Sequence, residues 1–257
     1  MTDARRTELL KANLNLYAVL KNLEDLTAHE SAAQSFSREL SMSIQFKVMN
    51  GPRAFVSFEG GRCTVGKGIH PRPRMVLGFI SPRHLNRMFD GQAVPIPLKG
   101  VHRLGFLLRE FTWLTDRMKH YLRPSEALLD QRPYLELNTR FSLTTAMFAL
   151  PELCALDPIG RQLLHHMGEG EVEVGVLPDG PRFSAEFCAG SVTVRKGKAR
   201  APMASMEFVD VKTANDLILG RADSFSIVAR GGVQTRGLLP MLDAMSIIWD
   251  RLPTYLN

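Results

Sequence analysis

Residues 206–220, MEFVDVKTANDLILG, hold the pattern that decides the fold, because the chain uses this pattern twice. The counterpart at residues 77–91 is LGFISPRHLNRMFDG. Each stretch predicts a strand followed by a short helix. The helix begins after Ser81 or Asp210, whose side-chain oxygens accept hydrogen bonds from free N–H groups at a helix start. It ends at a glycine, the residue that best adopts the left-handed backbone wanted there.

The repetition extends well beyond this stretch. Residues 52–91 align without a gap on residues 181–220, and 12 of the 40 positions carry the same residue. Average composition gives about two or three such matches by chance. The offset of 129 (181 − 52) exceeds the roughly 20–50 residues of solenoid repeats, so the sequence indicates a duplicated domain. We predict a first copy at 1–122, a linker at 123–135 and a second copy at 136–257.

The flanking segments repeat as well. Leucines three residues apart predict a helix at the start of each copy, with Leu20, Leu23 and Leu26 in the first and Leu150, Leu153 and Leu156 in the second. Ile44–Val48 alternates apolar and polar residues, which predicts a strand. Further strand-like segments follow at Ala54–Phe58, Arg62–Val65, Met75–Ile80 and Val94–Leu98. The second copy predicts strands at Val172–Val176, Phe183–Phe187, Ser191–Arg195, Ser205–Val209 and Phe225–Ala229.

Each copy closes with a predicted amphipathic helix. Apolar residues follow the spacing i, i+4, i+7, i+11 and i+14, which places them on one helix face. They are Leu107, Phe111, Leu114, Met118 and Tyr121, and, 131 residues later, Leu238, Leu242, Met245, Trp249 and Leu252.

This order of elements resembles the sterol carrier protein type 2 family. The residues that carry the resemblance are Met206–Gly220, Phe225–Gly231 as a strand ending in a glycine, and the helix from Leu238. The first copy repeats them more loosely, through Phe79, Leu85, Gly91 and Gly100. The resemblance implies an α/β (α+β) domain in which helices cover one face of a mixed five-stranded sheet. It also implies an apolar tunnel for lipids, sterols or fatty acyl-CoA, with no cofactor and no universal catalytic residue.

The expected ligand site lies beneath the closing helix of at least one copy, and the sequence leaves open whether one or both copies bind. Methionine suits such a wall because its side chain is flexible and polarizable. The residues predicted to bind a hydrophobic ligand are Met88, Phe111, Leu114, Met118, Leu217, Met241, Met245 and Trp249.

The basic residues gather in two runs without acidic neighbours. They predict a surface for an anionic partner such as a membrane, formed by Lys67, Arg72, Arg74, Lys196, Lys198 and Arg200. The runs lack the interleaved aromatic residues that stack on bases, which disfavours nucleic acid. A solvated rim on the two copies is the simpler alternative.

Familiar catalytic signatures are missing from the sequence, which has no GxSxG, Walker, HExxH or dinucleotide motif. Three cysteines without a CxxC pair favour a reducing compartment, and we expect the cytoplasm and no bound metal. We therefore predict a non-catalytic carrier of a hydrophobic ligand. Two alternatives remain open: an interaction protein that binds through its basic loops, and an enzyme on a carrier-like fold.

Overall fold

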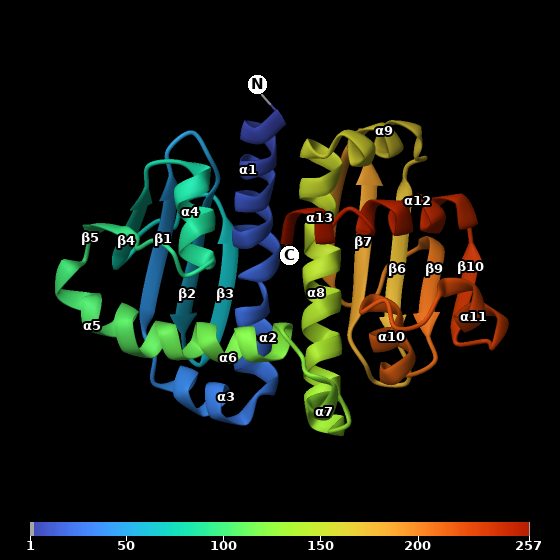
Figure 1. The fold of residues 1–257 in the computed structure, drawn as a ribbon, viewed down its shortest axis with the longest axis horizontal. Helices are drawn as coiled ribbons and strands as arrows, with labels where there is room; N and C mark the ends of the chain where they lie inside the picture. Colours follow the sequence, from blue (N-terminus) through green and yellow to red (C-terminus); the bar gives the residue numbers. More distant parts are fainter. Residues whose placement is uncertain (1–2, 257) are drawn as a thin grey trace. The chain divides into compact units, whose positions relative to one another are not determined.

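The chain forms two compact units (Figure 1). A computed structural model describes residues 3–256, so residues 1, 2 and 257 at the ends of the predicted domains lie outside the described residues. The first unit ends at Arg123 and the second begins at Pro124. Within residues 3–256, no helix combines the length and apolarity that crossing a bilayer requires.

The first unit begins with helices, continues with strands and closes with helices. Its opening helices are α1 (Asp3–Leu14), the π-helix η1 (Asn15–Val19), α2 (Asn22–His29) and α3 (Ser31–Arg38). Its strands are β1 (Met42–Val48), β2 (Arg53–Glu59), β3 (Arg62–Lys67), β4 (Met75–Phe79) and β5 (Ile96–Lys99), with α4 (Pro82–Phe89) between the last two. The closing segment comprises η2 (Val101–Arg103), α5 (Leu104–Phe106), the π-helix η3 (Leu107–Phe111) and α6 (Thr112–Leu122).

The second unit follows the same plan with more regular helices. Its helices are α7 (Glu126–Leu129), α8 (Arg132–Leu156), α9 (Pro158–His166), α10 (Val211–Ile218), α11 (Ser224–Ala229), α12 (Leu239–Trp249) and α13 (Pro253–Leu256). Its strands are β6 (Gly170–Val176), β7 (Arg182–Cys188), β8 (Ser191–Lys196), β9 (Pro202–Phe208) and β10 (Val233–Gly237). Helix α7 and the start of α8 fall inside the segment that we predicted as a linker.

The two sheets have the same topology. The first has the strand order β3-β2-β1-β4-β5 and the second β8-β7-β6-β9-β10. In each sheet the two central strands, β1 with β4 and β6 with β9, are parallel, and every other pair is antiparallel. The prediction of two repeated α+β domains with mixed five-stranded sheets is confirmed.

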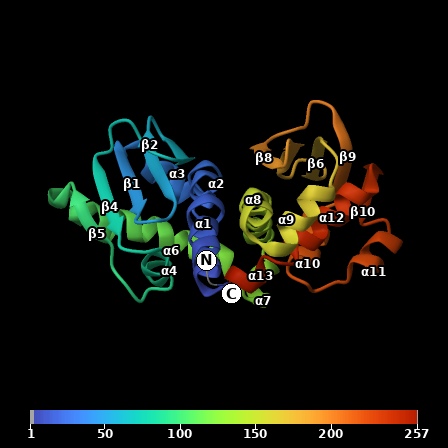
Figure 2. The same ribbon diagram turned by 90° about the horizontal axis from the view of Figure 1, so that it is seen from above.

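Helices pack against one face of each sheet, as the view from above shows (Figure 2). In the first unit this face carries Phe46, which stacks on Phe79 at 6.4 Å between ring centroids and contacts Phe111 at the same distance. All three rings are buried. Because side chains alternate across a strand, the neighbouring residues Gln45 and Lys47 point to the opposite face.

The helix caps predicted from the repeat are present in both units. The Ser81 hydroxyl accepts a hydrogen bond from the His84 N–H at 3.2 Å, and the Asp210 carboxylate accepts one from the Thr213 N–H at 2.7 Å. The glycines that follow these two helices have φ of 75° and 67°. The change from serine to aspartate therefore preserves the function of the cap.

One predicted strand was wrong. Residues 225–229 lie in helix α11, whose first turn is capped by Asp223 through a 2.8 Å hydrogen bond from the Ser226 N–H. The fifth strand of the second sheet is β10, and it ends at Gly237 instead of the predicted Gly231. The second closing helix is shorter than predicted, because Leu238 and Leu252 lie outside α12 and Leu238 is 45% exposed.

Candidate functional site

The first unit contains a partly open apolar cavity of about 220 Å³ between its sheet and its helices. Phe46 and Leu77 form the floor, and helices α4, η3 and α6 form the walls. The apolar side chains that line it are Leu20, Phe46, Leu77, Met88, Phe89, Pro95, Leu107, Leu108, Phe111 and Met118. The cavity therefore lies where the sequence predicts a hydrophobic ligand.

Two irregular helical segments border this cavity. The π-helix η3 contributes three lining residues, Leu107, Leu108 and Phe111, and Leu20 directly follows the π-helix η1. π-helical turns are rare and are frequently found at functional sites. In the second unit, α8 is α-helical from Arg132 to Leu156 and α12 from Leu239 to Trp249. The departures from regular geometry thus occur in the unit that has the apolar cavity.

One side of the cavity is polar. Successive turns of α6 contribute Thr112, Thr115, Asp116 and Lys119. The Thr112 hydroxyl donates to the Leu107 carbonyl of η3 at 3.0 Å and the Thr115 hydroxyl to the Thr112 carbonyl at 2.9 Å, which leaves both hydroxyl oxygens able to accept hydrogen bonds. Lys119 lies 3.8 Å from Asp116 in an exposed pair, which contributes little energy. An amphiphile with an anionic or hydroxyl head group would match this edge.

Three of the four ligand-binding residues predicted in the first copy line the cavity: Met88, Phe111 and Met118. Leu114 is fully buried but is not among the lining residues. Sequence reasoning did not single out the sheet floor or the polar edge as parts of the site. A floor residue such as Leu77 has the same apolar pattern as any core strand, so the sequence offers no signal that distinguishes it.

The four residues predicted in the second copy are placed differently. Met241 and Met245 are buried in the packing of α12, and Leu217 is half-buried. Trp249 is also half-buried, and its indole N–H donates to the Ala146 carbonyl at 3.0 Å. The cavity described in this unit, about 460 Å³ near α7, α8 and α10, includes none of the four.

The six predicted anionic-surface residues are all exposed, and they lie at the ends of β3 and β8 or in the loops that follow. In the first unit this loop is tied to the sheet face opposite the cavity. The His70 N–H donates to Gln45 Oε1 at 2.7 Å, and the Arg74 N–H donates to the Ser43 hydroxyl at 3.0 Å. In this unit Lys67 lies 4.6 Å from the Tyr17 ring centroid, and the Arg74 guanidinium donates to the Ser41 carbonyl.

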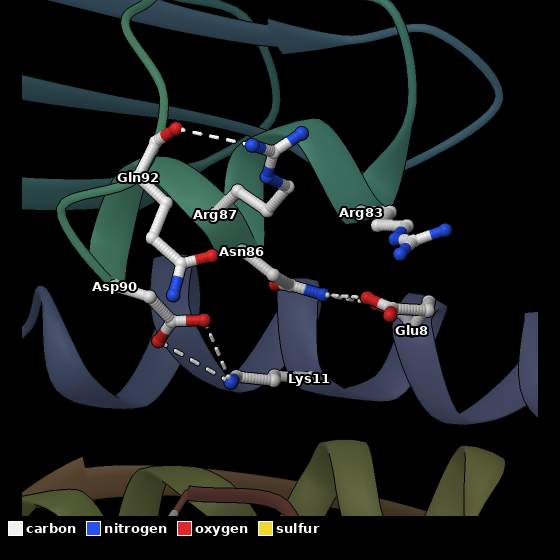
Figure 3. Close-up of a pocket in the computed structure, with 7 residues that line it drawn as sticks. All are labelled: Glu8, Lys11, Arg83, Asn86, Arg87, Asp90 and Gln92. Atoms are coloured by element: carbon white, nitrogen blue, oxygen red, sulfur yellow. Dashed lines mark hydrogen bonds and ion pairs between the residues drawn. The ribbon is translucent and has the colours of Figure 1, made fainter.

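A second, polar pocket of about 430 Å³ lies between α1 and α4 (Figure 3). Its polar groups largely bond to one another. Asn86 donates to the Glu8 carboxylate at 2.6 Å, and Lys11 pairs with Asp90 at 3.2 Å. Asn86 is buried and also accepts a hydrogen bond from the Asn15 amide at 3.1 Å. These contacts join α4 to the opening helices, which is a structural role.

The three cysteines differ in burial, so their thiols should differ in reactivity. Cys63 and Cys154 are buried, while Cys188 is exposed. Burial, together with the nearby charge of Asp157, raises the pKa of Cys154 to about 12, so its reactive thiolate is scarce at neutral pH. In the native protein we expect a disulfide reagent such as DTNB to react rapidly with one thiol, that of Cys188. The variant Cys188→Ser should abolish this rapid reaction. Rapid modification of a second thiol would contradict this assignment.

Metal chemistry has no evident site in the part of the chain described here, where no group of three or more His, Cys, Asp or Glu residues is arranged to hold an ion.

Comparison with known proteins leaves the family unassigned. No family model and no curated protein matches the sequence. Among solved structures, the chain is similar to a UbiJ-SCP2 ubiquinone synthesis protein, with 12% identity, a TM-score of 0.33, and coverage of 40% of this chain and 89% of that one. It is also similar to sterol carrier protein-2 like-3 from Aedes aegypti, with 12% identity, a TM-score of 0.24, and coverage of 38% and 96%.

A third similar structure is an enzyme, the inverting sec-alkylsulfatase Pisa1 from Pseudomonas sp. It shows 10% identity and a TM-score of 0.28, over 56% of this chain and 28% of that one. Likenesses this weak define neither a family nor an activity for the chain.

Proposed function

We propose that the first unit binds a hydrophobic or amphiphilic small molecule, with its apolar tail in the cavity beneath η3 and α6. The observation that carries this proposal is the cavity itself. Ten apolar side chains line it, and polar groups are restricted to one helix face. Binding of this kind requires no catalytic residue, so we propose a carrier or sensor of the ligand instead of an enzyme.

The size of the cavity limits what it holds. Its volume of about 220 Å³ is below the roughly 300–1,000 Å³ of most ligand pockets. It therefore suits a short tail or one end of a longer chain. Each CH₂ that leaves water contributes about 0.8 kcal/mol, so even part of an acyl chain binds with useful affinity. The remainder of a long ligand would extend past Leu108, a lining residue that is 70% exposed.

The polar edge suggests how the ligand is oriented. Lys119 supplies a positive charge for a carboxylate or phosphate, and the threonine hydroxyls accept a hydrogen bond from an alcohol. A fatty acid, an acyl-CoA and a sterol each combine a tail with one of these head groups. This proposal concerns the first unit, because the predicted residues of the second unit do not line its described cavity.

The test blocks the site in one unit and uses the repeat as its control. Met88 lines the cavity, and Leu217 is its counterpart in the second copy (217 − 88 = 129). Wild type should gain about 2.7 kcal/mol of stability from a ligand at 100 times its dissociation constant. We expect Met88→Trp to weaken binding at least about tenfold by filling the cavity, whereas Leu217→Trp leaves affinity unchanged.

Thermal shift with fatty acids, long-chain acyl-CoA and sterols measures these effects, and native mass spectrometry of the purified protein identifies any retained ligand. The absence of a shift across the panel would refute ligand binding. Equal losses in both tryptophan variants would refute its assignment to the first unit.

A further inference from the structure

An unusual share of the exposed apolar surface of the first unit lies in one short segment around its edge strand. The five exposed residues are Val94 (79%), Ile96 (42%), Leu98 (60%), Val101 (57%) and Leu108 (70%). We name them the β5 strip. They belong to β5 and the turns and helices next to it, at the outer edge of the sheet (Figure 1). Exposed apolar side chains concentrated in one segment mark an interaction site in a folded protein.

The strip is accompanied by positive charge alone. From residue 91 to residue 109 the chain contains no Asp or Glu, but it contains Lys99, Arg103 and Arg109. Lys99 donates to the Pro73 carbonyl at 2.8 Å, while Arg103 and Arg109 form none of the ion pairs given for residues 3–256. Apolar side chains interspersed with cations are the composition that binds the interface of an anionic bilayer.

The backbone of β5 argues against a protein strand as the partner. Pro97 lies within the strand and Pro95 just before it, and neither has an N–H to offer a neighbouring strand. The strand has only 4 residues and pairs irregularly with β4 near Leu77. Short, proline-containing and bulged edge strands resist the addition of another strand. The apolar side chains are therefore exposed on an edge that is poorly suited to strand pairing.

We propose that the β5 strip is the surface through which the first unit docks on an anionic lipid bilayer. The strip and the cavity also share one segment of the chain. Leu108 belongs to both, and Pro95 and Leu107, from the same segment, line the cavity. Docking itself is independent of what the cavity holds.

The strip differs from the basic loops singled out in the sequence. The loop at 68–74 is anchored to Gln45 and Ser43, on the sheet face opposite Phe46 and the cavity. Ile96 pairs with Gly78, which lies on that same face, so the two surfaces differ by their place in the strand order, in which β4 separates β1 from β5. Substitutions in the strip and in the basic loop should therefore have different effects on vesicle binding.

Partial repetition in the second unit supports the assignment. The residues from 224 to 242 also contain no Asp or Glu, and they include Arg230 and Arg236. Val228, Leu238 and Leu239 are 57%, 45% and 50% exposed there. The edge strand of each copy is thus flanked by exposed apolar residues and cations.

The experiment measures co-sedimentation of the full chain with two kinds of vesicle, phosphatidylcholine alone and phosphatidylcholine mixed with phosphatidylserine. We expect wild type to prefer the anionic vesicles and to lose binding as salt is raised. Arg103→Glu with Arg109→Glu should weaken binding at least about twentyfold, since each cation near such a surface contributes about fivefold. Val94→Ser with Ile96→Ser and Val101→Ser should weaken it at least about tenfold.

Matched controls keep the proposal falsifiable. Met49→Ser with Ile69→Ser and Ile80→Ser removes three apolar side chains of similar exposure outside the strip, at 59%, 57% and 61%. Arg72→Glu with Arg74→Glu makes the same charge change in the basic loop. Both controls should retain most of the binding. Equal losses in control and strip variants, equal binding to both vesicles, or concentration-dependent dimerisation that the strip variants abolish would overturn the proposal.

Ligand affinity in the absence of vesicles separates this proposal from the proposed function. The serine and glutamate variants spare the residues that line the cavity, so their thermal shifts with ligand should match wild type. If the protein binds vesicles through the strip but shows no thermal shift with ligand, the docking proposal stands and the proposed carrier function is refuted.

Discussion

Asp157→Ala is expected to lower the free energy of unfolding of the second unit by about 3 kcal/mol. Asp157 is fully buried, and its Oδ1 accepts hydrogen bonds from the Ile159 and Gly160 N–H groups at 2.9 Å each. Loss of such a helix cap costs about 1–2 kcal/mol. Its Oδ2 accepts hydrogen bonds from the Tyr255 hydroxyl at 2.6 Å and from Arg251 at 3.3 Å. Leaving the buried hydroxyl unpaired costs about 1–3 kcal/mol more.

The same carboxylate should make stability depend on pH. Burial alone would raise the pKa of Asp157, but hydrogen bonds from Tyr255 and Gly160 and the charge of Arg251 outweigh burial and lower the pKa. Its contribution is therefore complete above the unfolded pKa of about 3.9 and is lost as pH falls through the lower folded value. Urea unfolding across this range measures the effect.

Two variants separate the parts of this network. Asp157→Asn keeps a side-chain oxygen that can cap α9 but removes the titrating charge, so the acid loss of stability that depends on Asp157 should disappear. Tyr255→Phe removes only the hydroxyl and should cost less than Asp157→Ala. A wild-type unfolding midpoint in Asp157→Ala would show that the network does not stabilise the unit.

The duplication of the fold was predictable because it rests on local, repeated signals. Ser81 and Asp210 stand at equivalent positions before equivalent helices, and a cap depends on the few residues that follow it. The strands before them stand at equivalent positions in the two copies, and successive residues of a strand point to opposite faces of its sheet. The mixed five-stranded sheet with helices on one face followed from the resemblance of the whole pattern to a known family.

The cavity was predictable only in part. Met88, Phe111 and Met118 could be named because helix periodicity places them toward the sheet. The π-helical geometry of η1 and η3 could not, because an extra residue in a helical turn has no distinctive sequence pattern. Nor does a sequence show whether apolar side chains meet around a space or fill it. The sequence therefore left open whether one or both copies bind a ligand.

The network around Asp157 illustrates a third limit. Tyr255 lies 98 residues further along the chain, so nothing local links the two. By contrast, the error at residues 225–229 had a local signal. Asp223 stands directly before α11 and caps it, as Asp210 caps α10. Apolar alternation in a short segment concealed that cap, and the glycine that ends the fifth strand was consequently placed six residues early (237 − 231).

Gly237→Ala should therefore destabilise the second unit strongly, by about 3–4 kcal/mol, while Gly231→Ala should cost only about 1 kcal/mol. Both glycines have a left-handed backbone, with φ of 81° and 71°, which costs an alanine about 1–2 kcal/mol. At Gly237 an added Cβ would also collide with the Met203 carbonyl of β9, and backbone cannot move aside as a side chain can. At Gly231 no heavy atom lies within 4 Å of that position. Urea unfolding of the two variants measures the difference, and equal midpoints would contradict the placement of Gly237 at the end of β10.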